Sequence, residues 1–111
     1  MPHVLFVYDR PDSLASLPEE SRQEVYREYQ ALAGNPDMVG HRLQPGVPGT
    51  SLTVTDDRDR PRMEPIATDE LRIVGFYMLA TDDPVRAAQL AARIPAARLG
   101  GAIEVHRLAD E

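Results

Sequence analysis

Two segments of the chain are rich in β-branched and aromatic residues and predict strands. The first runs from Val4 to Tyr8 and is followed by turn residues at Asp9-Arg10-Pro11. The second, Arg72–Ala80, is the strongest strand pattern in the chain. Neither segment alternates between apolar and polar residues, so both faces of each strand are expected to be apolar.

The pattern between these two strands predicts one helix and a hairpin. Val25, Tyr29 and Leu32 fall at helical spacing and form one apolar stripe. The segment Ser16–Glu19 reads as the helix start, with Ser16 as cap, and Gly34-Asn35-Pro36 ends the helix.

After this helix, Met38–Leu43 predicts a weaker strand, and Thr50–Thr55 alternates as a half-buried strand does. We expect these two strands to pair across the loop Pro45–Gly49. The charged run Asp56–Arg62 is typical of a solvated hairpin tip.

The last third of the chain predicts a second helix and a final strand. Asp82 or Asp83 caps the helix, Pro84 occupies its first turn, and Pro95 ends it. Gly100-Gly101 then precedes the strand Ala102–Leu108. The order β, α, β, β, loop, β, α, β predicts a single α+β domain over residues 1–111. Its sheet is expected to be ferredoxin-like and antiparallel, with both helices on one face.

Two helices on one face leave the other face of the sheet uncovered. Val4, Phe6 and Tyr8 share one face of the first strand, and Leu5 and Val7 share the other. In the long strand, Ile73, Tyr77 and Leu79 are expected on one face, and Val74, Phe76 and Met78 on the opposite one. Because an open apolar face is typical of an interface or pocket, we expect face-to-face homodimers that enclose a small cavity.

Composition narrows the class of partner. The 111 residues carry a net charge of −6, and all 12 cations are arginine. No basic stripe for nucleic acid is present, and cysteine is absent. No apolar run approaches the roughly 20 residues of a membrane span. The N-terminus lacks the pattern of a signal peptide, so a cytoplasmic protein is expected.

The segment Gly75–Val105 resembles the YCII-related family, specifically its D-G-P-F subgroup. The similarity is carried by Gly75-Phe76-Tyr77, by Ala91–Ala97 (AARIPAA) and by Gly101–Val105 (GAIEV). The segments Val4–Asp9 and Arg42–Val54 fit the family as well. The resemblance implies a bacterial protein that forms a dimeric α/β barrel.

The family's D-G-P-F motif falls on Met63-Glu64-Pro65-Ile66, so Met63 stands where the family has aspartate. Few members have a defined activity. An enzymatic relative is a lyase of chlorinated hydroquinones that is thought to use a His–Asp pair, and some members are associated with alternative sigma factors.

Glu104 and His106 are the leading candidates for chemistry. They lie in phase on the last strand, opposite Ile103 and Val105, and about 7 Å apart along it. If Ile103 and Val105 face the helices, Glu104 and His106 face the cavity. A carboxylate beside an imidazole fixes its tautomer and favours its protonated form, as a general base requires. The alternative is a polar pair at the dimer seam.

Other residues could complete a site. His41 shares a face with Val39 and is either a second base or a hydrogen-bonded core residue, whereas His3 is expected at the surface of a strand edge. Candidate ligand-binding residues are Tyr8, Tyr77, Glu64 and Arg98. Arg98, Arg107 or an arginine of a second subunit could pair with Glu104.

No nucleotide, zinc or calcium motif is recognisable, so neither a metal nor a cofactor is expected. Two functions stay open. One is a small cofactor-free lyase, isomerase or cyclase that acts on an aromatic or polyketide-like substrate. The other is a non-catalytic homodimer that binds a small ligand or another protein in a regulatory role.

Overall fold

The computed structural model describes residues 3–10, 12–43, 52–57, 60–65 and 71–109; for 52–57 and 60–65 it describes the backbone only. Within these residues the strands are β1 (His3–Asp9), β2 (Met38–Arg42), β3 (Leu52–Asp57), β4 (Arg60–Pro65), β5 (Arg72–Leu79) and β6 (Ala102–Arg107). The helices are α1 (Glu19–Ala33), α2 (Pro84–Ala91) and the short 3-10 helix η1 (Pro95–Ala97).

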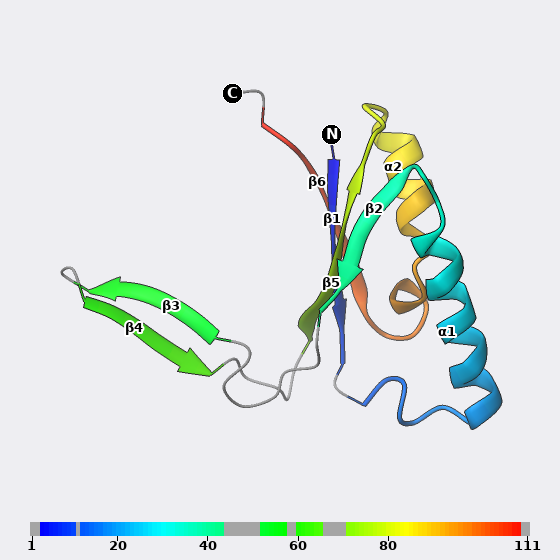
Figure 1. Ribbon diagram of the computed structural model, residues 1–111, viewed down its shortest axis with the longest axis horizontal. Helices are drawn as coiled ribbons and strands as arrows, with labels where there is room; N and C mark the ends of the chain where they lie inside the picture. Colours follow the sequence, from blue (N-terminus) through cyan, green and yellow to red (C-terminus); the bar gives the residue numbers. More distant parts are fainter. Residues whose placement is uncertain (1–2, 11, 44–51, 58–59, 66–70, 110–111) are drawn as a thin grey trace.

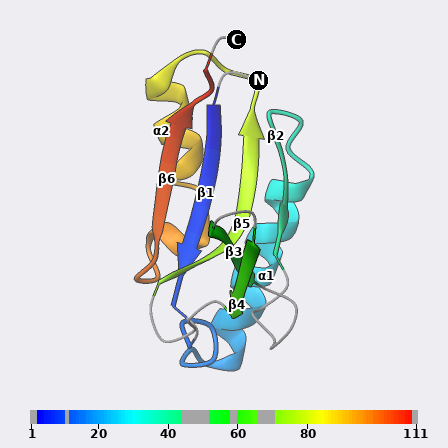
Figure 2. The ribbon, with the colours of Figure 1, turned by 90° about the vertical axis from the view of Figure 1, so that its left-hand side faces the viewer.

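The main sheet is antiparallel and four-stranded, in the order β2-β5-β1-β6. This α+β arrangement is compatible with the ferredoxin-like fold that the sequence predicts. Both α-helices lie against one face of the sheet, and the four strands are seen side by side from the opposite face (Figures 1 and 2). The two strands with apolar residues at most positions, β1 and β5, are neighbours at the centre of the sheet.

The predicted pairing of the second and third strands is wrong. β2 pairs with β5 and forms an edge of the main sheet, whereas β3 pairs with β4. β4 begins three residues after β3 ends, so β3 has a partner nearby in sequence, whereas β2 pairs with β5 and buries Met38. The charged run Asp56–Arg62 therefore lies in this hairpin. It includes the last residues of β3 and the first half of β4. The hairpin extends away from the main sheet on the side opposite the helices (Figure 1).

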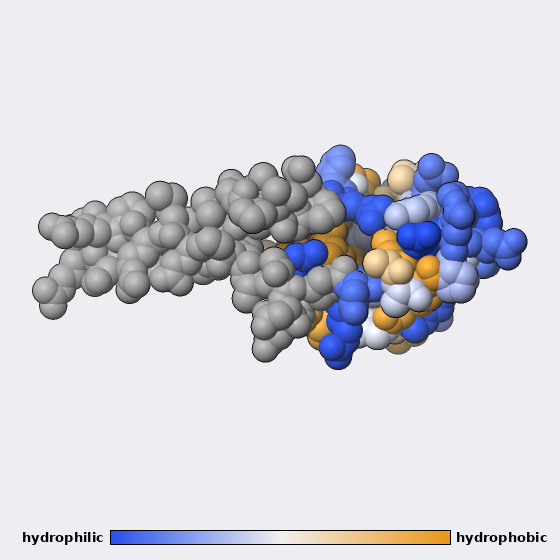
Figure 3. Space-filling model, turned by 90° about the horizontal axis from the view of Figure 1, so that it is seen from below, coloured by the Kyte–Doolittle hydropathy of each residue, from blue (hydrophilic) through white to orange (hydrophobic). Residues whose placement is uncertain are grey.

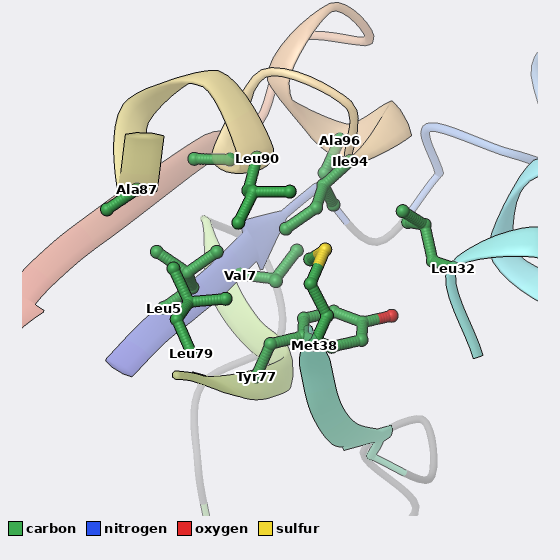
Figure 4. Packing of buried hydrophobic residues seen from close by; sticks show 11 residues of the cluster. Leu5, Val7, Leu32, Met38, Tyr77, Leu79, Ala87, Leu90, Ile94 and Ala96 are labelled. Atoms are coloured by element: carbon green, nitrogen blue, oxygen red, sulfur yellow. The ribbon is translucent and has the colours of Figure 1, made fainter. Parts of the chain in front are cut away.

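The core lies between the main sheet and the helices (Figure 4). β1 contributes Leu5 and Val7, and β5 contributes Tyr77 and Leu79, all at most 4% exposed. Opposite them lie apolar residues of the helices and the segment that follows α2, including Leu32, Ala87, Leu90, Ile94 and Ala96. The apolar stripe predicted for α1 is confirmed, since Val25 and Leu32 are buried and Tyr29 packs on the core.

The predicted N-terminal cap is confirmed for α2 and is wrong for α1. Asp83 caps α2 as predicted, with its carboxylate accepting a hydrogen bond from the Val85 N–H at 2.9 Å. Ser16 does not cap α1, because Pro18 occupies the cap position and the Ser16 hydroxyl donates instead to the Ser13 carbonyl. The predicted capping box is therefore wrong.

A β-bulge changes which side chains of β5 share a face. Val7 pairs with Gly75 and Tyr8 with Ile73, so Val74 is the extra residue. Val74 packs against the core, and Ile73 lies opposite Tyr8, the reverse of the predicted assignment. The predicted faces of β1 and of Phe76, Tyr77, Met78 and Leu79 are confirmed.

Gly101 is expected to be intolerant of a side chain, because a Cβ there would lie 2.2 Å from the Tyr8 carbonyl oxygen and 2.9 Å from that of Ala96. We expect Gly101→Ala to lower the free energy of unfolding by about 1–3 kcal/mol, as overpacking does. Chemical denaturation measures this change.

Gly34→Ala is the matched control, since its nearest neighbour would lie at 3.7 Å and its φ of −86° suits any residue. Equal effects of the two substitutions would contradict the close approach at Gly101.

Candidate functional site

The face of the main sheet that the helices leave uncovered carries the candidate site. We call it the open face, defined by Val39 and His41 of β2, Ile73, Phe76 and Met78 of β5, Val4, Phe6 and Tyr8 of β1, and Glu104 and His106 of β6. The strand register aligns His41, Phe76, Phe6 and Glu104 in one row across the sheet. A polar group thus stands at each end of a phenylalanine pair.

Tyr8, Glu104 and His106 form a hydrogen-bonded cluster at the β6 edge of the open face. The Tyr8 hydroxyl donates to Oε1 of Glu104 at 3.1 Å. The Nε2 atom of His106 lies 3.3 Å from the same Oε1. Residues two apart on a strand share a face, which is why Glu104 and His106 meet, and Tyr8 reaches them from the neighbouring strand. One carboxylate oxygen therefore holds both a phenol and an imidazole.

The imidazole of His106 is also positioned by an aromatic ring. Its centroid lies 5.5 Å from that of Phe6, with the rings at 64° to each other, an edge-to-face contact. If Nε2 carries the proton that Glu104 accepts, Nδ1 is left with a free lone pair. The side chains of Glu104 and His106 are 52% and 53% exposed. A small molecule can therefore reach this base in the single chain.

The pKa of Tyr8 is raised above its ordinary value of 10. Burial is the largest cause, and the hydrogen bond to Glu104 and the charge of that carboxylate add to it. Tyr8 is therefore a neutral hydrogen-bond donor near pH 7, which suits it to orient Glu104 or to donate to a substrate oxygen.

His41 lies at the opposite edge of the open face. Its ring packs near Phe76, with centroids 6.1 Å apart, and it also lines a cavity between α1 and β2. Three strand spacings of roughly 4.8 Å separate β2 from β6, so about 14 Å lies between His41 and the Glu104 row. Within one chain, the structure does not bring His41 to the other candidate catalytic residues.

Of the remaining candidate residues, Tyr77 and Arg98 do not join the cluster on the open face. Tyr77 lies in the core on the helix side and is 4% exposed, so it does not share a face with Tyr8. Arg98 pairs with Glu28 of α1, and not with Glu104. Glu64 belongs to β4, and its side chain lies outside the described residues.

His3 also corrects an expectation. It is 3% exposed, and its Nδ1 lies 2.8 Å from the Thr81 carbonyl oxygen. Because a carbonyl oxygen only accepts, Nδ1 carries the proton. His3 is thus a buried, hydrogen-bonded residue that ties β1 to the segment before α2.

The sequence patterns did not identify Arg42 as a candidate site residue, although it contacts two tyrosines on the helix side of the sheet. Arg42 of β2 lies in phase with the buried Met38, so its guanidinium lies on the helix side and packs over the rings of Tyr26 and Tyr29. An arginine at a core-facing strand position is the signal that could have identified it.

No cluster of three or more metal-binding side chains occurs in the described ranges. None of the helices within these ranges is long and apolar enough to span a membrane. No protein-family model matches the chain, and no curated protein matches it either. The fold and site define an α+β protein with an exposed tyrosine–carboxylate–imidazole cluster.

Replacing Glu104 with glutamine is expected to lower the pKa of Tyr8, because the negative charge that opposes phenolate formation is removed. The pKa should stay above 10, since burial remains the largest cause of the shift. NMR titration of the ¹³Cζ-labelled tyrosines measures it.

Glu28→Gln is the control, because Glu28 pairs with Arg98 far from Tyr8. An unchanged Tyr8 titration in Glu104→Gln would contradict the contact between the two side chains.

Proposed function

We propose that the protein is a YCII-related homodimer whose two open faces pack together as a dimeric α/β barrel. The support is the covering of the sheet: helices bury one face, while Phe6, Phe76 and Met78 remain partly exposed on the other. Val39 at the β2 edge is 52% exposed. Burying such a face against a second copy removes apolar surface from water, the main favourable term in association.

The hairpin gives a second argument for this dimer. β3 and β4 extend on the same side of the sheet as the open face (Figure 1). A two-stranded hairpin alone is marginally stable in water. A second sheet placed against the open face would lie beside this hairpin and could support it.

We further propose that the Tyr8–Glu104–His106 cluster performs cofactor-free proton transfer on a small aromatic or polyketide-like substrate. The observation that carries this proposal is the shared Oε1 atom of Glu104, within 3.1 Å of Tyr8 and 3.3 Å of His106. The substrate class follows from the apolar ring surface of Phe6 beside the imidazole, since aromatic rings stack well on such surfaces.

In this mechanism Nδ1 of His106 removes a proton from an acidic C–H of the substrate. The positive charge that forms on the imidazole strengthens its hydrogen bond to Glu104, which becomes charge-assisted on both sides. The Tyr8 hydroxyl can turn from Glu104 to the substrate oxygen that gains negative charge. The proton then returns from His106 to another carbon, which completes an isomerisation, or stays on His106 while a leaving group departs.

A non-catalytic homodimer is the second candidate function. Two observations favour it: Met63 occupies the aspartate position of the D-G-P-F motif, and His41 lies across the sheet from Glu104. A regulatory dimer of this kind would bind a small ligand or another protein without turnover. A ligand that raises the melting temperature and is recovered unchanged would favour it over the enzyme.

Phe76→Asp is expected to convert the dimer to a monomer, because it would bury a charge at the centre of the packed open faces. Sedimentation equilibrium at micromolar concentration measures the mass, against 12.3 kDa for one chain. Val85→Asp is the control, since Val85 is 63% exposed on α2 and leaves the open face intact. A monomeric native protein would contradict the proposed dimer.

His106→Gln is expected to slow proton transfer by roughly 10²- to 10⁴-fold, the usual contribution of a general base. Solvent-deuterium exchange into 1-phenylbutane-1,3-dione, a small aromatic diketone with an acidic C–H, can be followed by NMR. Glu104→Gln should also slow exchange, whereas Glu20→Gln on the exposed surface of α1 should not. A larger loss from His41→Gln than from His106→Gln would contradict the assigned base.

A further inference from the structure

A cleft of about 120 Å³ lies on the helix side of the sheet, at the end where β1 finishes and β5 begins. We call it the arginine cleft, and its charged and phenolic lining residues are Asp9, Arg10, Tyr29, Arg42, Arg72 and Tyr77. These residues come from β1 and the residue after it, from α1, and from β2 and β5. The cleft is separate from the Tyr8–Glu104–His106 cluster, which lies on the other face of the sheet.

The local charge of the arginine cleft is opposite to that of the whole chain. The described lining residues include three arginines and a single carboxylate, that of Asp9. Asp9 is 7% exposed and accepts a hydrogen bond from the Arg10 backbone N–H at 2.9 Å. The net charge of the chain is −6. Arginines are therefore concentrated here in an otherwise acidic protein, which favours an anionic ligand.

Arg42 is held in a defined orientation. Its guanidinium carbon lies 4.7 Å from the centroid of the Tyr29 ring and 5.9 Å from that of Tyr26. A guanidinium that packs by its flat face against an aromatic ring keeps its in-plane N–H groups available for a ligand. These N–H groups form the planar fork that matches a carboxylate.

The phenol of Tyr29 adds a neutral donor. The pKa of Tyr29 is raised to about 12; burial is the largest cause, the nearby Asp9 carboxylate adds to the rise, and Arg42 opposes it. Tyr29 therefore stays protonated at neutral pH. It adds no negative charge that would repel an anion.

The apolar part of the lining sets the size of the ligand's apolar body. Val7, Leu14, Leu43 and Val74 form this part of the wall. Viewed from this end of the molecule, hydrophobic surface lies beside strongly hydrophilic side chains (Figure 3). The cleft is smaller than the closed cavity of about 150 Å³ that holds benzene, so it suits a small acid whose apolar body is only partly enclosed.

We propose that the arginine cleft binds a small organic carboxylate, with the carboxylate on Arg42 and Arg72 and its apolar body against Val7 and Val74. The apolar wall favours an organic acid over inorganic phosphate, which has no apolar surface to bury. This site is independent of the function proposed for the open face.

Titration with benzoate, followed by ¹⁵N NMR of the native protein, tests the proposal. Binding is expected with a dissociation constant on the order of 1 mM, reasonable for so small a ligand. The amides of Asp9, Arg10 and residues 72–75 should shift, while those of Glu104 and His106 should not. Benzamide, which is neutral and nearly the same shape, should bind at least about tenfold more weakly, because it lacks the charge-assisted hydrogen bonds.

Substitutions then assign the residues. Arg42→Gln and Arg72→Gln should each weaken benzoate binding by about tenfold or more, and Arg42→Lys should weaken it less than Arg42→Gln. Arg93→Gln, on the exposed residue beyond α2, is the matched control and should leave binding unchanged. Thermal unfolding of each variant verifies that it is folded.

Several results would overturn the proposal. These are equal binding of benzoate and benzamide, binding of inorganic phosphate but not benzoate, shifts confined to the open face, or no binding of any probe. Benzoate binding that survives both arginine substitutions in folded protein would overturn it as well.

Discussion

The two α-helices cover only one face of the main sheet, and the placement of the other features follows from this. A helix layer buries one face of a sheet, and here it buries Leu5, Val7 and Leu79 almost completely. The two central strands, however, also carry apolar residues such as Phe6 and Phe76 on the opposite face. No helix among the described residues covers that face, so its apolar residues favour association with a second sheet. The proposed dimer follows from this imbalance.

The same constraint sorts the polar residues into two sets. On the open face, Glu104 sits at an edge strand, where it can remain half exposed while contacting Tyr8 and His106. On the helix side, Arg42 and Asp9 lie at the end of the sheet, where the helix layer leaves a cleft. An acidic and imidazole-containing cluster and an arginine-rich cleft thus occupy opposite faces. Their separation allows two independent small-molecule sites in 111 residues.

Much of the fold could be predicted because it follows from local patterns. The faces of β1, the Asp83 cap and the position of Glu104 and His106 on one face all depend on residue spacing alone. The pairing of β2 could not be predicted in this way, because it depends on which distant strand buries Met38 best. The proposed family rests on sequence resemblance, and the proposed roles of Tyr8, Glu104 and His106 rest on the chemistry of their side chains.

In the candidate site, too, contacts between distant segments could not be predicted from local residue patterns. A one-residue bulge at Val74 reversed the faces of two side chains, and no local pattern marks that bulge. Opposite charge alone makes Arg98 a candidate partner for Glu104, but its position after η1 brings it to Glu28. The distance between His41 and Glu104 depends on strand order, which periodicity does not specify. Contacts within a strand were therefore predictable, and contacts across strands were not.

Isotope-filtered NMR of a mixed dimer detects directly whether the two open faces pack together. Labelled and unlabelled chains are combined, and only contacts between different chains are detected. If the open faces pack together, such contacts come from the rings of Phe6 and Phe76 and the methyl group of Met78, all on the open face. Contacts between chains that involve only the helix surface, such as Val85, or no such contacts at all, would contradict this packing.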